Sequence, residues 1–101
     1  MKQDYKGFTV PERIWRSENL DMNAKFVACC LIDYATKNSL SSGRDGGTLI
    51  YMNDSTYKSI LSKHRFEHDK FIFGAARLSL ERFASNLGYD SNGNFCIKIY
   101  F

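Results

Sequence analysis

Two histidines spaced four residues apart, His64 and His68, and three cysteines, Cys29, Cys30 and Cys96, are the side chains best suited to metal binding or proton transfer. Histidines at i and i+4 share one face of a helix, where they could bind a metal or act as acid and base within a cleft. A tetrahedral metal site needs about four ligands, and the sequence contains no C-x-x-C pair to supply two of them. We therefore expect no metal and no cofactor.

The sequence also lacks the motifs of known catalytic sites. It contains no Gly-rich phosphate loop, no nucleophile elbow, no H-E-x-x-H and no paired-carboxylate spacing. A domain of this size rarely encloses a cleft deep enough for catalysis. We expect no catalytic residues, and a protein that acts by binding rather than as an enzyme.

The length of 101 residues limits the chain to one domain with one hydrophobic core. Hydrophobic residues make up 44% and aromatic residues 15%, which is enough to fill a core and argues against disorder. The net charge of +3 and the isoelectric point near 8.8 are mildly basic. This charge permits nucleic-acid binding without requiring it.

Composition also bears on the compartment. No run of about eighteen apolar residues exists, and the N-terminal segment MKQDYKGF is too polar for a secretion signal. The adjacent Cys29 and Cys30 cannot easily bridge one another, so no disulfide framework is indicated. We expect a cytoplasmic protein in a reducing compartment with no membrane partner.

Capping residues place the elements of the first half. Proline suits the first position of a helix, and an aspartate carboxylate accepts an N–H group at a helix start. We expect a flexible arm at residues 1–6, followed by a single domain spanning 7–101. The domain is expected to begin with an extended segment Gly7–Val10 and a short helix begun by Pro11. A helix from about Met22 to Ala35, capped by Asp21, and an exposed mobile loop Lys37–Gly47 are expected to follow.

The second half is read in the same way. Alternation of apolar residues predicts strands, helical spacing predicts helices, and Asn-Gly is a strong hairpin signal. We expect a strand Thr48–Met52, a helix begun by Asn53 and Asp54 and ending near His64, and a turn at Arg65 and Phe66. A third helix is expected from about Glu67 to Asn86, closed by Gly88. The chain is expected to finish with a hairpin made of a strand starting at Tyr89, the turn Asn92-Gly93 and a strand Phe95–Phe101.

The third helix has two predicted faces. Apolar residues at helical spacing indicate a buried stripe, and polar residues between them indicate an exposed face on which Gly74 would allow a partner to approach the backbone. We expect the buried stripe to be Ile72, Ala76, Leu80, Phe83 and Leu87, and the exposed face to be Lys70, Gly74, Arg77, Glu81 and Ser85.

The segment GFTVPERIWRSENLDMNAKFVACCLIDYA resembles the opening of winged-helix domains found in plasmid replication initiators and phage replisome organisers. These domains share its extended segment, its Pro-led short helix, its Ser…Leu break and its Ala-Lys helix. The rest of the chain, from Asp54 through Gly88 and Tyr89, is similar in plan. The resemblance implies an α+β fold: a winged helix-turn-helix with three main helices, a C-terminal two-stranded wing and a short N-terminal strand.

It also implies double-stranded DNA as the leading partner, because the third helix would then be the recognition helix that enters the major groove. Arg77 would pair with a guanine edge, Arg65 would fix the register, and lysines would contact phosphates. The implied DNA-binding residues are Lys58, Lys63, Arg65, His68, Lys70, Gly74 and Arg77.

Two features depart from this pattern. Glu67 and Asp69 stand at the start of the expected recognition helix, where they would repel phosphate. The expected wing tip, Asp90–Asn94, carries no lysine or arginine. Wings that contact DNA usually carry a lysine or an arginine there.

The alternative is a small interaction protein of a phage or other mobile element that inhibits a host protein, such as an anti-CRISPR or another host-defence antagonist. Tyrosines are enriched at protein interfaces. We therefore expect Tyr5, Tyr51, Tyr89 and Tyr100 to share one surface if this reading holds. We expect a monomer or a weak homodimer.

Overall fold

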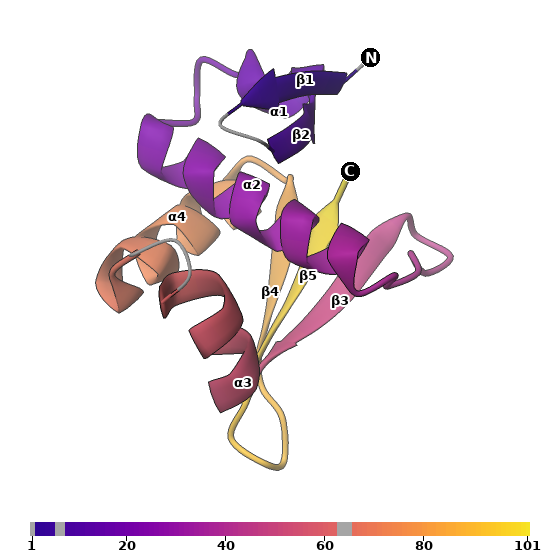
Figure 1. Ribbon diagram of the computed structural model, residues 1–101, viewed down its shortest axis with the longest axis vertical. Helices are drawn as coiled ribbons and strands as arrows, with labels where there is room; N and C mark the ends of the chain where they lie inside the picture. The colour runs from indigo at the N-terminus through magenta and orange to yellow at the C-terminus, as the bar shows by residue number, and fades with distance from the viewer. Residues whose placement is uncertain (1, 6–7, 63–65) are drawn as a thin grey trace.

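The chain has an α+β fold (Figure 1). The computed structural model describes residues 2–5, 8–62 and 66–101. Its elements are β1 (Lys2–Tyr5), β2 (Phe8–Pro11), α1 (Glu12–Trp15), α2 (Met22–Lys37), β3 (Gly47–Met52), α3 (Asp54–Tyr57), a π-helical turn η1 (Lys58–Ser62), α4 (His68–Leu80), β4 (Ala84–Tyr89) and β5 (Phe95–Tyr100).

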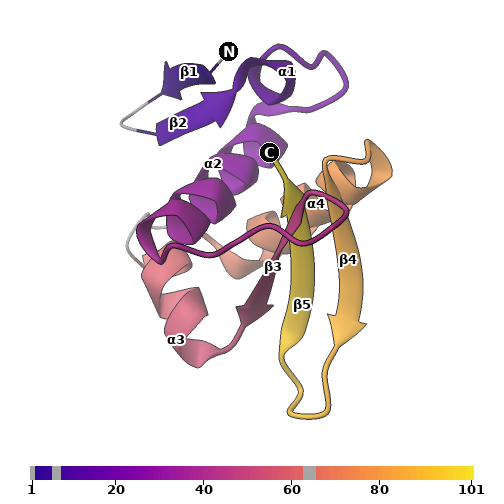
Figure 2. The same cartoon turned by 90° about the vertical axis from the view of Figure 1, so that its right-hand side faces the viewer.

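The main sheet has three antiparallel strands in the order β3-β5-β4, so the last strand lies between the two earlier ones. Its long helices lie on one side of the sheet, and the outer face is open apart from the loop that precedes β3 (Figures 1 and 2). The sequence predicted the strand at Thr48–Met52 and a separate C-terminal hairpin, but not that the three strands form one sheet. Strand β3 pairs with β5 because its alternating residues Thr48, Ile50 and Met52 are buried.

A second, two-stranded sheet joins β1 to β2. Lys2–Tyr5 fall within the segment expected to be a flexible arm and form β1, antiparallel to Phe8–Pro11. Pro11 precedes α1 as its N-cap. Arg13 Nη2 donates a hydrogen bond to the carbonyl of Tyr100 at 2.7 Å, which ties α1 to the end of the main sheet.

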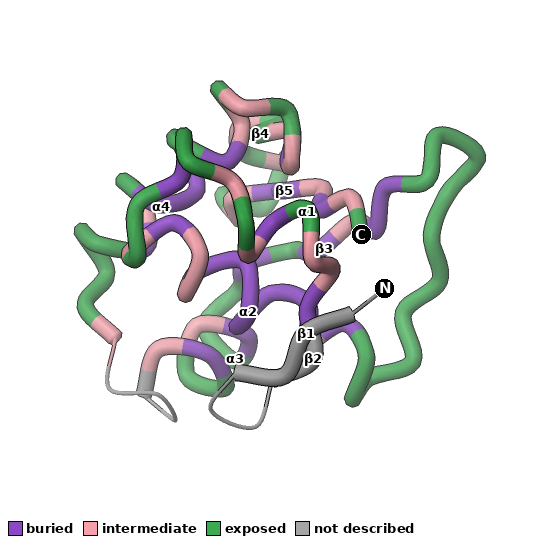
Figure 3. The backbone as a smooth tube through the Cα atoms, turned by 90° about the horizontal axis from the view of Figure 1, so that it is seen from above, coloured by how far each residue is buried: buried purple, intermediate pink, exposed green. Residues whose placement is uncertain are grey.

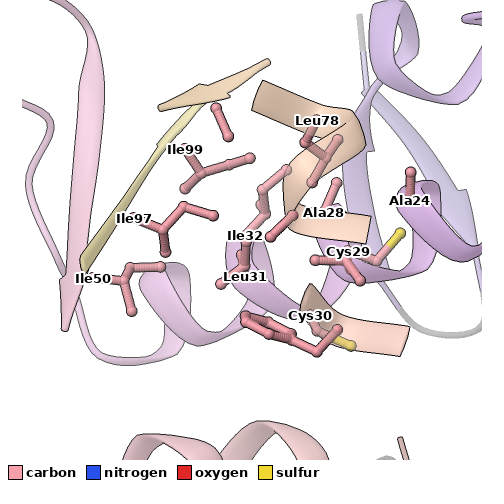
Figure 4. Packing of buried hydrophobic residues seen from close by; sticks show 14 of the residues in the cluster. Ala24, Ala28, Cys29, Cys30, Leu31, Ile32, Ile50, Leu78, Ile97 and Ile99 are labelled. Atoms are coloured by element: carbon pink, nitrogen blue, oxygen red, sulfur yellow. The ribbon is translucent and has the colours of Figure 1, made fainter. Parts of the chain in front are cut away.

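Helix α2 is the scaffold of the core. Asp21 caps it as expected, with its Oδ1 accepting from the backbone N–H of Ala24 at 2.8 Å. The helix buries Ala28, Leu31 and Ile32 against the sheet. Figure 4 shows these side chains facing Ile50, Ile97 and Ile99 from the strands and Leu78 from α4.

Helix α3 also begins where the sequence indicates. Asn53 Oδ1 accepts from the backbone N–H and the hydroxyl of Thr56, at 2.9 and 3.1 Å. The helix continues as η1 through Ser62. Its expected end near His64 lies outside the described residues.

Helix α4 differs from the expected third helix in length and in rotation. It ends at Leu80, not at Asn86. Its buried residues are Phe71, Gly74, Ala75 and Leu78, whereas the predicted core residues Leu80 and Leu87 are 70% and 53% exposed. The predicted core stripe is therefore wrong for α4.

The end of α4 explains the missed boundary. Arg82 N donates to the Ser79 carbonyl and Phe83 N to the Leu78 carbonyl, at 3.1 and 2.8 Å, which is the hydrogen-bond pair of a Schellman motif. Arg82 takes the left-handed conformation of that motif, with φ of 65°, at a position that usually holds glycine. The residues that follow form β4, and Gly88 does not close a helix. It lies at an irregularity in β4, with φ of 79°.

Of the loop expected at Lys37–Gly47, residues 38–46 are exposed (Figure 3), whereas Lys37 ends α2 and Gly47 begins β3. Asp45 anchors the loop to the open face of the sheet through an ion pair with Lys98 Nζ at 2.9 Å. This contact lowers the pKa of the Asp45 carboxyl. Within residues 2–5, 8–62 and 66–101, no helix is long and apolar enough to cross a membrane.

Candidate nucleic-acid interface

The outward face of α4 carries an apolar stripe. Phe73 and Leu80 are 71% and 70% exposed, and Ala76 between them is exposed as well. Positions i, i+3 and i+7 fall on one side of a helix, and Figure 3 shows α4 alternating between buried and exposed residues. We call Phe73, Ala76 and Leu80 the outward stripe.

Two basic residues lie beside this stripe, on the side nearest α2. Lys70 is exposed, and its carbonyl accepts a hydrogen bond from Asn23 Nδ2 of α2 at 2.8 Å. The Arg77 side chain is 47% exposed and stands 4.0 Å from Glu81, a distance at which an exposed ion pair contributes little. We call Lys70 and Arg77 the basic flank.

The stripe and Arg77 line a shallow hollow of about 300 Å³ whose far wall is Asp21, at the start of α2. The Asp21 carboxylate is engaged in capping α2. The hollow therefore has an apolar floor with one cation, Arg77, and one carboxylate, Asp21, at its edges.

Of the other predicted DNA-binding residues, two are exposed, one is buried and two lie outside the described residues. Lys58 is exposed on η1, and His68 is exposed at the start of α4, with its ring 5.2 Å from that of Tyr57. Gly74 was predicted to face a partner and is instead buried. An added Cβ there would overlap the Val27 side chain, so the glycine exists for helix packing. Lys63 and Arg65 lie outside the described residues.

Acidic residues border the face as the sequence indicates. Glu67 and Asp69 are exposed at the start of α4, and Glu67 makes no side-chain cap. In the turn between β4 and β5, Asp90 Oδ1 accepts from the backbone N–H groups of Asn92 and Asn94, both at 2.9 Å. These bonds lower the pKa of Asp90, that to Asn94 most, so the turn keeps a negative charge.

Two of the three cysteines are unsuited to nucleophilic chemistry. Cys29 and Cys30 are buried, and burial raises the pKa of their thiols to about 11 and about 12. A thiol with such a pKa is protonated at neutral pH and is a poor nucleophile. Among the residues that the structure describes, no three His, Cys, Asp or Glu side chains come together as a metal site.

Tyr51 and Tyr100 lie on the open face of the sheet, in β3 and β5, whereas Tyr89 lies apart from them. Tyr89 is 72% exposed and packs edge-on against Phe95, 5.6 Å away. Tyr100 lies at the other end of β5, where its hydroxyl hydrogen-bonds with Ser85 at 3.0 Å. The side chain of Tyr5 lies outside the described residues.

Sequence reasoning missed Phe73, although a signal was present. Phe71, Ile72 and Phe73 are consecutive, and successive helix residues point about 100° apart, so the three cannot all face one core. One of them had to be exposed or only partly buried. Phe71 is buried, Ile72 is half-buried and Phe73 is exposed.

Comparison of the chain with protein-family models, with curated proteins and with solved structures finds no match.

Proposed function

We propose that this protein is a winged-helix DNA-binding protein without enzymatic activity, of the type that serves replication initiation or transcriptional control in phages and plasmids. The order strand, helix, helix and two further strands, with β5 between β3 and β4, supports a winged helix-turn-helix. In this arrangement α3 with η1 and α4 form the helix-turn-helix, and β4 and β5 form the wing.

The observation that carries the proposal is the placement of cations around α4. Lys70 and Arg77 border its outward face, and Lys58 is exposed on the preceding helical turn. The major groove is about 12 Å wide and admits one α-helix, with phosphates on both sides of it. Lys58 and Lys70 suit phosphate contacts, and Arg77 suits the acceptor edge of guanine.

Duplex binding measured by fluorescence anisotropy at two salt concentrations tests the proposal. The two phosphate contacts, by Lys58 and Lys70, would lower the affinity about 12-fold between about 50 and about 200 mM salt, because each contact releases counterions. The double variant Lys58→Ala, Lys70→Ala should bind more weakly and reduce the slope of log affinity against log salt by about 2.

The double variant Lys37→Ala, Arg44→Ala is the matched control. It removes the same charge at the end of α2 and in the following loop, on the opposite side of the molecule from α4 (Figure 1). Its affinity should remain close to that of the wild type. Equal losses in the two double variants would show that net charge, not this face, attracts the duplex.

The outward stripe favours a second candidate function, the binding of a protein. Large apolar side chains exposed together on one helix face are typical of interfaces. On this alternative, the chain is a small phage or mobile-element protein that inhibits a host protein. This alternative predicts that the protein does not bind a duplex at low salt. It also predicts that the immobilised wild type retains a host protein that the variant Phe73→Ser, Leu80→Ser does not retain.

A further inference from the structure

We infer that the outward stripe recognises the 5-methyl groups of thymines in the major groove, so that the protein prefers duplexes rich in A·T pairs. This inference rests on the proposed DNA-binding function and names the substrate that the same face selects. The outward stripe at the centre of this face is apolar, whereas the edges of the bases are mostly polar.

The side chains on the stripe cannot make hydrogen bonds. Phe73 and Leu80 are 71% and 70% exposed, and Ala76 between them leaves room for close approach. All four bases present hydrogen-bond donors or acceptors in the major groove, and thymine alone adds a methyl group beside its O4 acceptor. Placing Phe73 or Leu80 against a polar base edge would remove water from that edge and leave its donors or acceptors without hydrogen-bond partners.

Contact with a methyl group avoids that cost. Apolar side chains of α-helices are suited to the thymine methyl, and the contact removes apolar surface of both partners from water. The outward stripe can make such a contact while Lys70 and Arg77, which lie beside it, reach phosphates or a guanine at the border.

Polar readout is confined to the edges of the face. Asp69 stands at the N-terminal end of the stripe and Arg77 beside it. A carboxylate accepts from the cytosine amino group and a guanidinium donates to guanine. The geometry therefore points to a site with thymines at its centre and any G·C pairs at its borders.

Replacing thymine with deoxyuridine tests the inference, because it deletes the methyl group and keeps every hydrogen bond of the base pair. A duplex rich in A·T pairs and its deoxyuridine counterpart of the same sequence would be titrated with the protein at low salt. The wild type should bind the deoxyuridine duplex about fourfold more weakly for each methyl group contacted, the loss expected for one buried carbon group.

Two variants separate the stripe from the basic flank. Phe73→Ser, Leu80→Ser should bind both duplexes equally, since the contact with the methyl groups is gone. Lys70→Ala should weaken binding to both duplexes by the same factor and preserve the difference between them.

The outcomes separate this inference from the proposed function. Salt-sensitive binding with equal affinity for the two duplexes would overturn the methyl recognition and leave DNA binding in place. Failure of the wild type to bind either duplex at low salt would overturn both, and would favour the protein-binding alternative.

Discussion

The two faces of α4 carry similar side chains in opposite environments. The inner face has Phe71 and Leu78, which are fully buried, and the outer face has Phe73 and Leu80, which are about 70% exposed. The inner face packs on α2 and the sheet, whereas the outer face is open to solvent at Phe73 and Leu80. Composition therefore does not distinguish the face that folds the protein from the face that we propose binds a ligand.

The largest expected effect is on the inner face. Phe71→Ala should lower the free energy of unfolding by about 3 to 5 kcal/mol, because it removes a fully buried ring from the core. Phe73→Ala is its matched control and should change stability by no more than about 0.5 kcal/mol. Urea unfolding of both variants measures the difference. Equal losses would contradict the described rotation of α4.

Gly74→Ala should destabilise by about 1 to 3 kcal/mol, because the added Cβ overlaps Val27 and forces α2 and α4 apart. At an exposed helix position the same change would stabilise by about 1 kcal/mol, so the sign decides whether Gly74 is buried. Val27→Ala in the same chain should remove part of the penalty. Thermal unfolding of the single and double variants measures both effects.

A smaller gain in stability is expected at the end of α4. Arg82→Gly should stabilise the protein by about 0.5 kcal/mol, because relief of the left-handed backbone, worth about 1 to 2 kcal/mol, exceeds the cost of glycine in unfolded-state entropy, about 0.4 to 1 kcal/mol. Ser39, with φ of 53°, ends α2 in the same way, and Ser39→Gly should behave alike. A loss of stability in both variants would argue against these helix ends.

The smallest expected effect is that of Leu80→Ala. The sequence pattern predicted a buried residue and a loss of about 2 to 5 kcal/mol. With 70% of Leu80 exposed, the change should alter stability by about 0.5 kcal/mol or less. Chemical unfolding of this variant decides between the two rotations of the helix.

Local signals in the sequence sufficed for about half of the fold. The caps at Asp21 and Asn53 are confirmed by their hydrogen bonds. The last strand is confirmed as β5, with Ile97 and Ile99 buried, although Cys96 on the other face is buried too and Phe101 lies beyond the strand. These features depend on a few neighbouring residues, which is why the sequence reveals them.

The rotation and the end of α4 depend on distant residues. The stripes through Phe71 and through Ile72 both have helical spacing, and the space beside Val27 that only Gly74 fits decides between them. The helix ends at Leu80, and the left-handed position that follows is held by Arg82 and not by a glycine that would mark the stop. The placement of Lys70 and Arg77 on the exposed side was predicted correctly, while Gly74 was assigned to the wrong face.

The most direct test of the account is an amide chemical-shift titration of the ¹⁵N-labelled protein with a short duplex at low salt. We predict that the largest shifts fall on Lys70, Phe73, Ala76, Arg77 and Leu80. Residues on the open face of the sheet, such as Leu49 and Tyr51, should keep their positions. Shifts concentrated on that sheet face, or no shifts at all, would contradict DNA binding through α4.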